Sequence, residues 1–114
     1  DTKVYEAKHG IDAAVAAVGS APAYLFLLAE AQIAAAVRMG IEPETARRMT
    51  TQTMLGAATL MATDERTPHE LRAAVTSAGG TTAAAVRVLE AHGFMGAVGE
   101  AMDAARARSA ELGR

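Results

Sequence analysis

Apolar and polar residues recur along this chain at the three- and four-residue spacing of amphipathic α-helices. The last segment is a clear case, with Phe94, Val98, Met102 and Ala105 at steps of four, four and three. No pair of stretches shows the two-residue alternation of half-buried strands. We therefore expect an all-α fold, a bundle of about six helices.

Turn and capping residues set the expected ends of these helices. Asp12 is a candidate N-cap for a short helix over residues 13–18, and Gly40 stands where a left-handed C-cap glycine would end a helix over residues 22–39. Pro43 is suited to open the third helix, and Thr67 with Glu70 has the spacing of a capping box before the fourth. The fifth and sixth helices are expected to meet at residues 92–93.

Composition suggests that these helices need more cover than one chain supplies. About half of the 114 residues are apolar, but there are only two Phe, two Tyr and no Trp. Small side chains bury little area each, so close packing against a second copy is the usual remedy. Residues 13–29 carry no charge, which makes a membrane span conceivable. Gly19 and Pro22 interrupt that stretch, so we expect a partner chain rather than a membrane to cover it.

The charge balance and the absence of cysteine narrow the function classes. A net charge of −2 without a basic stripe argues against nucleic-acid binding. Without cysteine there is no disulfide framework or thiol nucleophile, which fits a cytoplasmic protein. His9, His69 and His92 are isolated in the sequence, so no metal site is expected. The first residues lack the pattern of a signal peptide, and a chain that starts at Asp1 is expected to be part of a longer protein.

Residues 75–82, which read VTSAGGTT, have a composition that packing alone does not require. One helix ends here, two glycines follow, and two threonines open the next helix. A helix start presents unpaired N–H groups and partial positive charge, and glycines allow a ligand to approach them closely. The stretch therefore suggests a site for a carboxylate or phosphate. The alternative is a plain turn with Ser77 or Thr81 as N-cap.

The parts of a complete enzyme are missing from the chain. It has no Gly-rich dinucleotide fingerprint, no phosphate-binding P-loop and no serine in a nucleophile elbow. The chain could still lend residues to an active site completed elsewhere.

Three motifs, in order along the chain, resemble those of pyrroline-5-carboxylate reductases. Residues 12–24 read DAAVAAVGSAPAY, where that family has DAVTAxSGSGPAY. Residues 52–58 read QTMLGAA, similar to its QTxxGAA helix, and residues 71–82 read LRAAVTSAGGTT, similar to its LRxxVTSPGGTT signature. The match runs from about residue 4 to the end.

The resemblance implies a particular domain organisation. Residues 11–114 would be the family's C-terminal helical domain, which interlocks with a second copy as in the 6-phosphogluconate dehydrogenase C-terminal fold. Residues 1–10 would be a lead-in or the remnant of an interdomain linker. The family's N-terminal Rossmann domain, which binds NADPH or NADH, would be absent, so this chain would bind no cofactor and would be inactive alone. Family enzymes are oxidoreductases that reduce 1-pyrroline-5-carboxylate to L-proline, and their homodimers often assemble into rings.

The resemblance also implies which ligand binds at residues 75–82. Ser77, Gly79, Gly80 and Thr81 would bind the substrate carboxylate, and Val75 would line the pocket for the ring. Thr82 would be the catalytic residue, with its hydroxyl at the ring nitrogen.

The sequence departs from the family's motifs at several positions. Ala78 stands in place of Pro, Ala21 in place of Gly, and Val15 and Val18 in place of Thr and Ser. Two alternatives therefore stay open: a helical oligomerisation module that has lost the chemistry, and a related imine reductase with another substrate.

Overall fold

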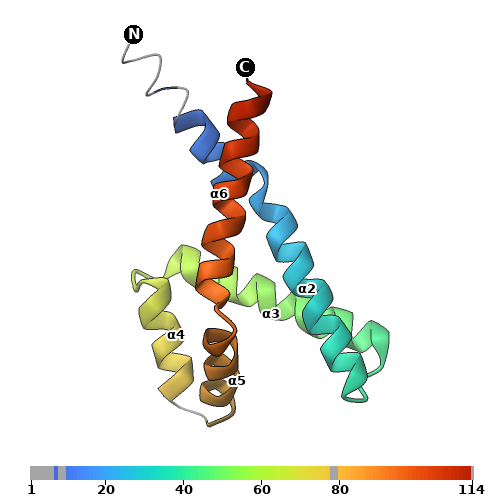
Figure 1. The fold of residues 1–114 in the computed structure, drawn as a ribbon. Helices are drawn as coiled ribbons and strands as arrows, with labels where there is room; N and C mark the ends of the chain where they lie inside the picture. Colours follow the sequence, from blue (N-terminus) through green and yellow to red (C-terminus); the bar gives the residue numbers. More distant parts are fainter. Residues whose placement is uncertain (1–6, 8–9, 78–79, 114) are drawn as a thin grey trace. The chain divides into compact units, whose positions relative to one another are not determined.

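The computed structural model describes Ala7, residues 10–77 and residues 80–113, and all regular structure in these ranges is helical (Figure 1). The elements are the π-helix η1 (Val15–Gly19) and the α-helices α2 (Ala21–Arg38), α3 (Pro43–Thr63), α4 (Pro68–Ser77), α5 (Gly80–Ala91) and α6 (Phe94–Leu112). The predicted all-α class is confirmed. The first predicted helix differs, because a helical turn over residues 10–14 continues into the π-helix.

Local signals define the start of α3 as predicted. Gly40 before it has φ of 103°, the left-handed conformation that glycine adopts without strain. Pro43 opens the helix, and the Glu42 carboxylate accepts hydrogen bonds from the backbone N–H groups of Glu44 and Thr45 at 3.1 and 3.0 Å. These bonds stabilise the charged form of Glu42 and lower its pKa.

The predicted capping box is present at the start of α4. The Glu70 N–H donates to the Thr67 hydroxyl at 3.1 Å, and the Thr67 N–H donates to the Glu70 carboxylate at 3.0 Å. In the preceding turn, Arg66 donates to both carboxylate oxygens of Asp64, through Nε at 3.1 Å and Nη2 at 2.8 Å. The side-chain bonds from Arg66, joined by one from its backbone N–H, lower the pKa of Asp64 to about 2.

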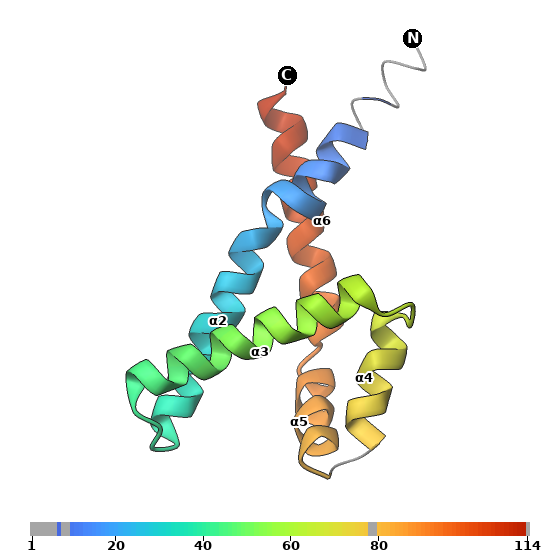
Figure 2. The same cartoon turned by 180° about the vertical axis from the view of Figure 1, so that it is seen from behind.

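The described chain falls into two compact units. One contains the residues up to Phe26 together with those from Glu90 onward, and the other is Leu27–Leu89. In the first unit η1 packs against α6, and the two segments cross in both views (Figures 1 and 2).

Asp12 has a different role from the one predicted. It lies inside the helical turn before η1, so it is not an N-cap. Its side chain is buried and accepts a hydrogen bond from the Ser109 hydroxyl of α6 at 2.8 Å. A capping argument looks only three residues ahead and could not find a partner 97 residues away.

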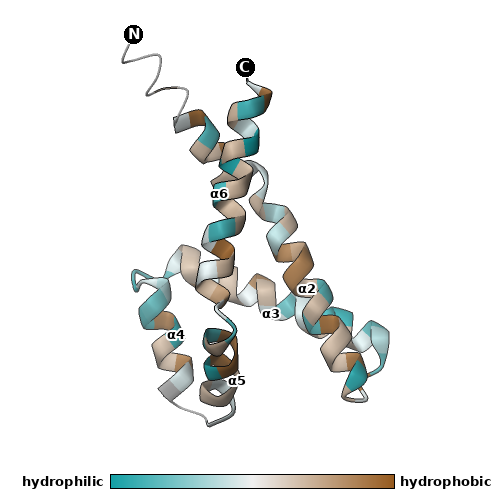
Figure 3. Cartoon of the chain, viewed as in Figure 1, coloured by the Kyte–Doolittle hydropathy of each residue, from teal (hydrophilic) through white to brown (hydrophobic). Residues whose placement is uncertain are grey.

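The chain has very little interior of its own. Among the described residues the buried apolar side chains are Ala16 and Ala46, and no large side chain is fully buried. Leu25, Phe26 and Leu27 are 57, 69 and 67% exposed on α2, where apolar colour is prominent (Figure 3). The helical run Gly10–Arg38 is long and apolar enough to cross a membrane, and 11% of its most apolar window is buried within the chain.

We predict that the contribution of the Asp64–Arg66 pair disappears in acid. The folded pKa of Asp64 is about 2, below its ordinary 3.8, so the pair stabilises the fold above pH 3.8 and loses this effect as the pH falls toward 2. Asp64→Asn should therefore lower the melting temperature slightly at pH 6 and not at pH 2, as measured by circular dichroism at fixed protein concentration.

Glu65→Gln, which removes a neighbouring exposed carboxylate, is the matched control. A melting-temperature difference between wild type and Asp64→Asn that stays constant from pH 6 to pH 2 would contradict the prediction.

Candidate functional site

The predicted substrate turn joins α4 to α5, and both helices belong to the same compact unit. Ser77 is the last residue of α4, and Gly80 is the first residue of α5. Val75, on the last turn of α4, is 58% exposed. Gly79 was predicted to bind the carboxylate and lies, with Ala78, outside the described residues.

Thr81 and Thr82 both lie in the first turn of α5. Thr81 is exposed and Thr82 is half-buried. Neither Ser77 nor Thr81 occupies the N-cap position of this helix, because Ser77 belongs to α4 and the helix already begins at Gly80. Among the described residues, no side chain contacts either threonine hydroxyl through a hydrogen bond.

Gly80 leaves open space in front of the helix start. A Cβ built on it would meet nothing within 4 Å, and Gly80 is not among the described glycines with positive φ. Neither packing nor backbone conformation within the chain therefore requires glycine here. A glycine does give a ligand close access to the first N–H groups of α5, which have no acceptor inside the helix.

The charge of a bound anion would be balanced by the backbone rather than by side chains. Residues 73–86 contain no charged side chain, and Arg72 and Arg87 flank this stretch. The available positive potential is that of the α5 N-terminus, supplemented by hydroxyl donors. A helix start of this kind is chemically suited to a carboxylate or a phosphate.

The end of α4 contains a bond that the sequence analysis did not single out. The Thr76 hydroxyl donates to the Arg72 carbonyl one turn earlier at 2.6 Å, and Thr76 is half-buried. Back-bonding of this kind is common for a threonine within a helix, and it fixes the side chain just before the turn. The signal for this bond in the sequence is a threonine, Thr76, near the end of the predicted helix and directly before Ser77.

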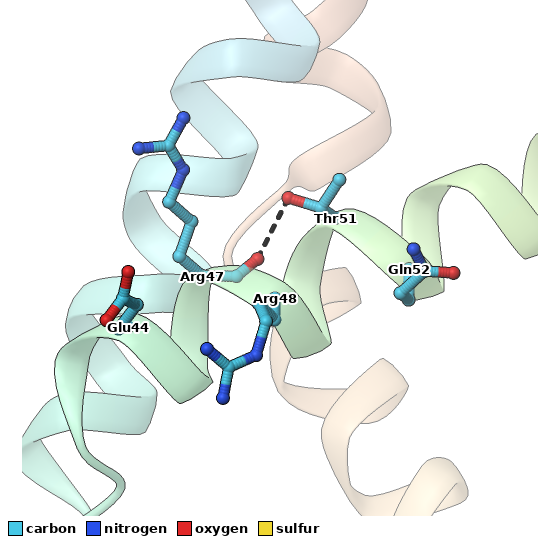
Figure 4. Close-up of a pocket in the computed structure, with 5 residues that line it drawn as sticks. All are labelled: Glu44, Arg47, Arg48, Thr51 and Gln52. Carbon is cyan, nitrogen blue, oxygen red and sulfur yellow. Dashed lines mark hydrogen bonds between the residues drawn. The ribbon is translucent and has the colours of Figure 1, made fainter.

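A hollow on α3 is unrelated to the predicted site. Its lining comes from one helix: Glu44, Arg47, Arg48, Thr51 and Gln52. The guanidinium groups of Arg47 and Arg48 point apart (Figure 4), so they do not converge on one ligand. The Thr51 hydroxyl is already bonded to the Arg47 carbonyl at 2.9 Å.

Comparison with known proteins agrees with the fold and the motifs. The family profile described as pyrroline-5-carboxylate reductase dimerisation matches residues 8–112. The pyrroline-5-carboxylate reductase of Pseudomonas aeruginosa is 50% identical over 102 residues, and that of Corynebacterium melassecola is 47% identical over 108. These matches cover 90 and 95% of this chain but 37 and 40% of the relatives, so the chain spans about two fifths of their length.

Solved structures show the same likeness. A pyrroline-5-carboxylate reductase from Coxiella burnetii is 42% identical with a TM-score of 0.87, and the match covers 91% of this chain and 38% of that one. A pyrroline carboxylate reductase from Plasmodium falciparum, solved with NADP bound, is 30% identical with a TM-score of 0.88 and coverages of 93 and 40%. The chain therefore belongs to the pyrroline-5-carboxylate reductase dimerisation family.

Proposed function

We propose that this chain is the dimerisation and substrate-binding part of an enzyme that reduces 1-pyrroline-5-carboxylate to L-proline. The observation that carries the proposal is the match of the whole helical chain, motifs included, to part of the length of such reductases. The nicotinamide cofactor, NADPH or NADH, supplies the hydride and would be bound by a domain outside this chain.

The dimer is supported by the exposed apolar surface. Leu25 and Phe26 on α2, and Met95 on α6, are 57, 69 and 81% exposed in the single chain. Uncovered apolar area of this kind is typical of an interface between copies. We propose a second copy rather than lipid as the cover, because residues 8–112 match a dimerisation family. We accordingly propose a cytoplasmic homodimer, which could build larger rings.

The turn between α4 and α5 would orient the substrate. The backbone N–H groups of Gly79 and Gly80, with the hydroxyls of Ser77 and Thr81, would bind the carboxylate at the positive end of α5. Thr82, one residue further into the helix, would place its hydroxyl at the ring nitrogen. The C=N bond takes up a hydride at carbon and a proton at nitrogen, so a donor held at that nitrogen fixes the ring and polarises the bond. Val75 would line the ring pocket.

The dimer interface predicts a position-specific effect of charge. Phe26→Lys should convert the dimer to a monomer at micromolar concentration, because the lysine ammonium would be desolvated against apolar side chains of the second copy. Gln32→Lys, at an exposed polar position of the same helix, is the matched control and should leave the dimer intact. Light scattering gives the mass; a monomeric wild-type chain would contradict the proposal.

The chemistry can be tested by exchanging this chain for the matching segment of the Pseudomonas aeruginosa relative. We expect this chimera to reduce 1-pyrroline-5-carboxylate, and we expect Thr82→Val to lower kcat by about tenfold or more through loss of the hydroxyl donor. Thr63→Val, which removes an exposed hydroxyl at the end of α3, should have no effect.

The outcomes separate the alternatives. A dimeric chimera without activity would make this chain an oligomerisation module that has lost the chemistry. Activity on another cyclic imine only would make it a related imine reductase. Unchanged kcat in Thr82→Val would remove Thr82 from the mechanism.

A further inference from the structure

The π-helical turn η1 carries an unusual pattern of hydrogen bonds. The Ser20 N–H donates to the carbonyl of Val15, five residues earlier, at 2.8 Å. In an α-helix this N–H would instead bond to the carbonyl of Ala16. Ala16 is 3% exposed and packs in the unit formed with α6, so water cannot easily replace the lost partner.

The Tyr24 side chain supplies the missing donor. Its hydroxyl donates to the Ala16 carbonyl at 3.2 Å, across eight residues. A buried carbonyl without a partner is costly, so this bond stabilises the wide turn relative to a plain helix. Pro22 acts in the same direction, because it has no N–H and its ring would collide with the Val18 carbonyl in a straight helix.

The wide turn also changes which residues face inward. Asp12 and Ala16 are buried and lie four residues apart, and Ser20 and Ala21, four and five residues further on, are both half-buried. The next inward residue, three further on, is Tyr24 itself, while the adjacent Leu25 and Phe26 face out. A straight α-helix would continue from residue 20 to residue 23, whereas Ala23 is exposed and Tyr24 is half-buried. One added residue rotates everything after it by about 100° about the helix axis.

We infer that the Tyr24 hydroxyl is a positioning group for dimerisation. By holding the wide turn, it fixes the angle between the inner face that packs on α6 and the outer apolar face of α2 that includes Leu25 and Phe26. The Asp12–Ser109 hydrogen bond anchors the other end of the turn on α6. The inference rests on the proposed dimer, because the outer face has a role only if a second copy covers it.

The test removes one hydroxyl and keeps the ring. Tyr24→Phe should weaken the dimer about tenfold, as measured by sedimentation equilibrium, because each copy loses a hydrogen bond to a buried carbonyl. It should also speed hydrogen exchange of the Ser20 amide, the donor of the π-turn, more than exchange of the Thr50 amide in α3. Thr63→Val is the matched control, since it removes a hydroxyl bonded to the Thr59 carbonyl of a regular helix at 2.9 Å.

A second variant keeps the test decisive if Tyr24→Phe fails to fold. Ser109→Ala removes the hydrogen bond to Asp12 that anchors the other end of the same turn. It too should speed hydrogen exchange of the Ser20 amide more than that of the Thr50 amide. The inference would be overturned if Tyr24→Phe had the same dimer affinity and the same Ser20 exchange rate as Thr63→Val. That result would not contradict the proposed dimer. A wild-type chain that is monomeric would instead overturn the proposed function.

Discussion

The small number of apolar side chains buried within one chain is the constraint on which the rest of this structure depends. Its helices are rich in alanine, and in the described residues the buried apolar side chains are Ala16 and Ala46. An alanine methyl group removes little surface from water, so each helix gains little by folding alone. The conformational entropy lost by some hundred ordered residues must nevertheless be offset. The offsetting free energy is available from burial of the exposed leucine, phenylalanine and methionine side chains, and only another surface can cover them.

Features set by neighbouring residues were predictable, and features set by distant ones were not. Gly40 and Pro43 mark helix ends through their own backbone conformation, and the Thr67–Glu70 box does so through two bonds that span three residues, so the sequence alone locates them. Asp12 was misassigned because its partner, Ser109, lies at the other end of the chain. The π-turn was missed because a helix was expected to stop at Gly19. Pro22 was a signal in the sequence, but which of Ala23 and Tyr24 is turned inward depends on the fold.

The candidate site was likewise predictable from the sequence only in part. The glycines and threonines of residues 79–82 indicated an anion site, and the start of α5 at Gly80 agrees with that chemistry. The role of each residue came from the resemblance, since a helix N-terminus accepts any carboxylate or phosphate. Thr82 differs from Thr81 in being half-buried, a distinction that no periodicity argument contained. Under the proposed function the hydride donor would be bound outside this chain, so the turn would form only part of an active site.

The dependence of thermal unfolding on protein concentration tests the central claim most directly. If a second copy completes the core, the folded dimer is in equilibrium with unfolded chains, and mass action should raise the melting temperature steadily between 1 and 100 μM, roughly a hundredfold range. The calorimetric enthalpy should then fit a dimer-to-unfolded-monomer transition. A melting temperature that does not change over that range, with a cooperative transition at the mass of one chain, would contradict the account.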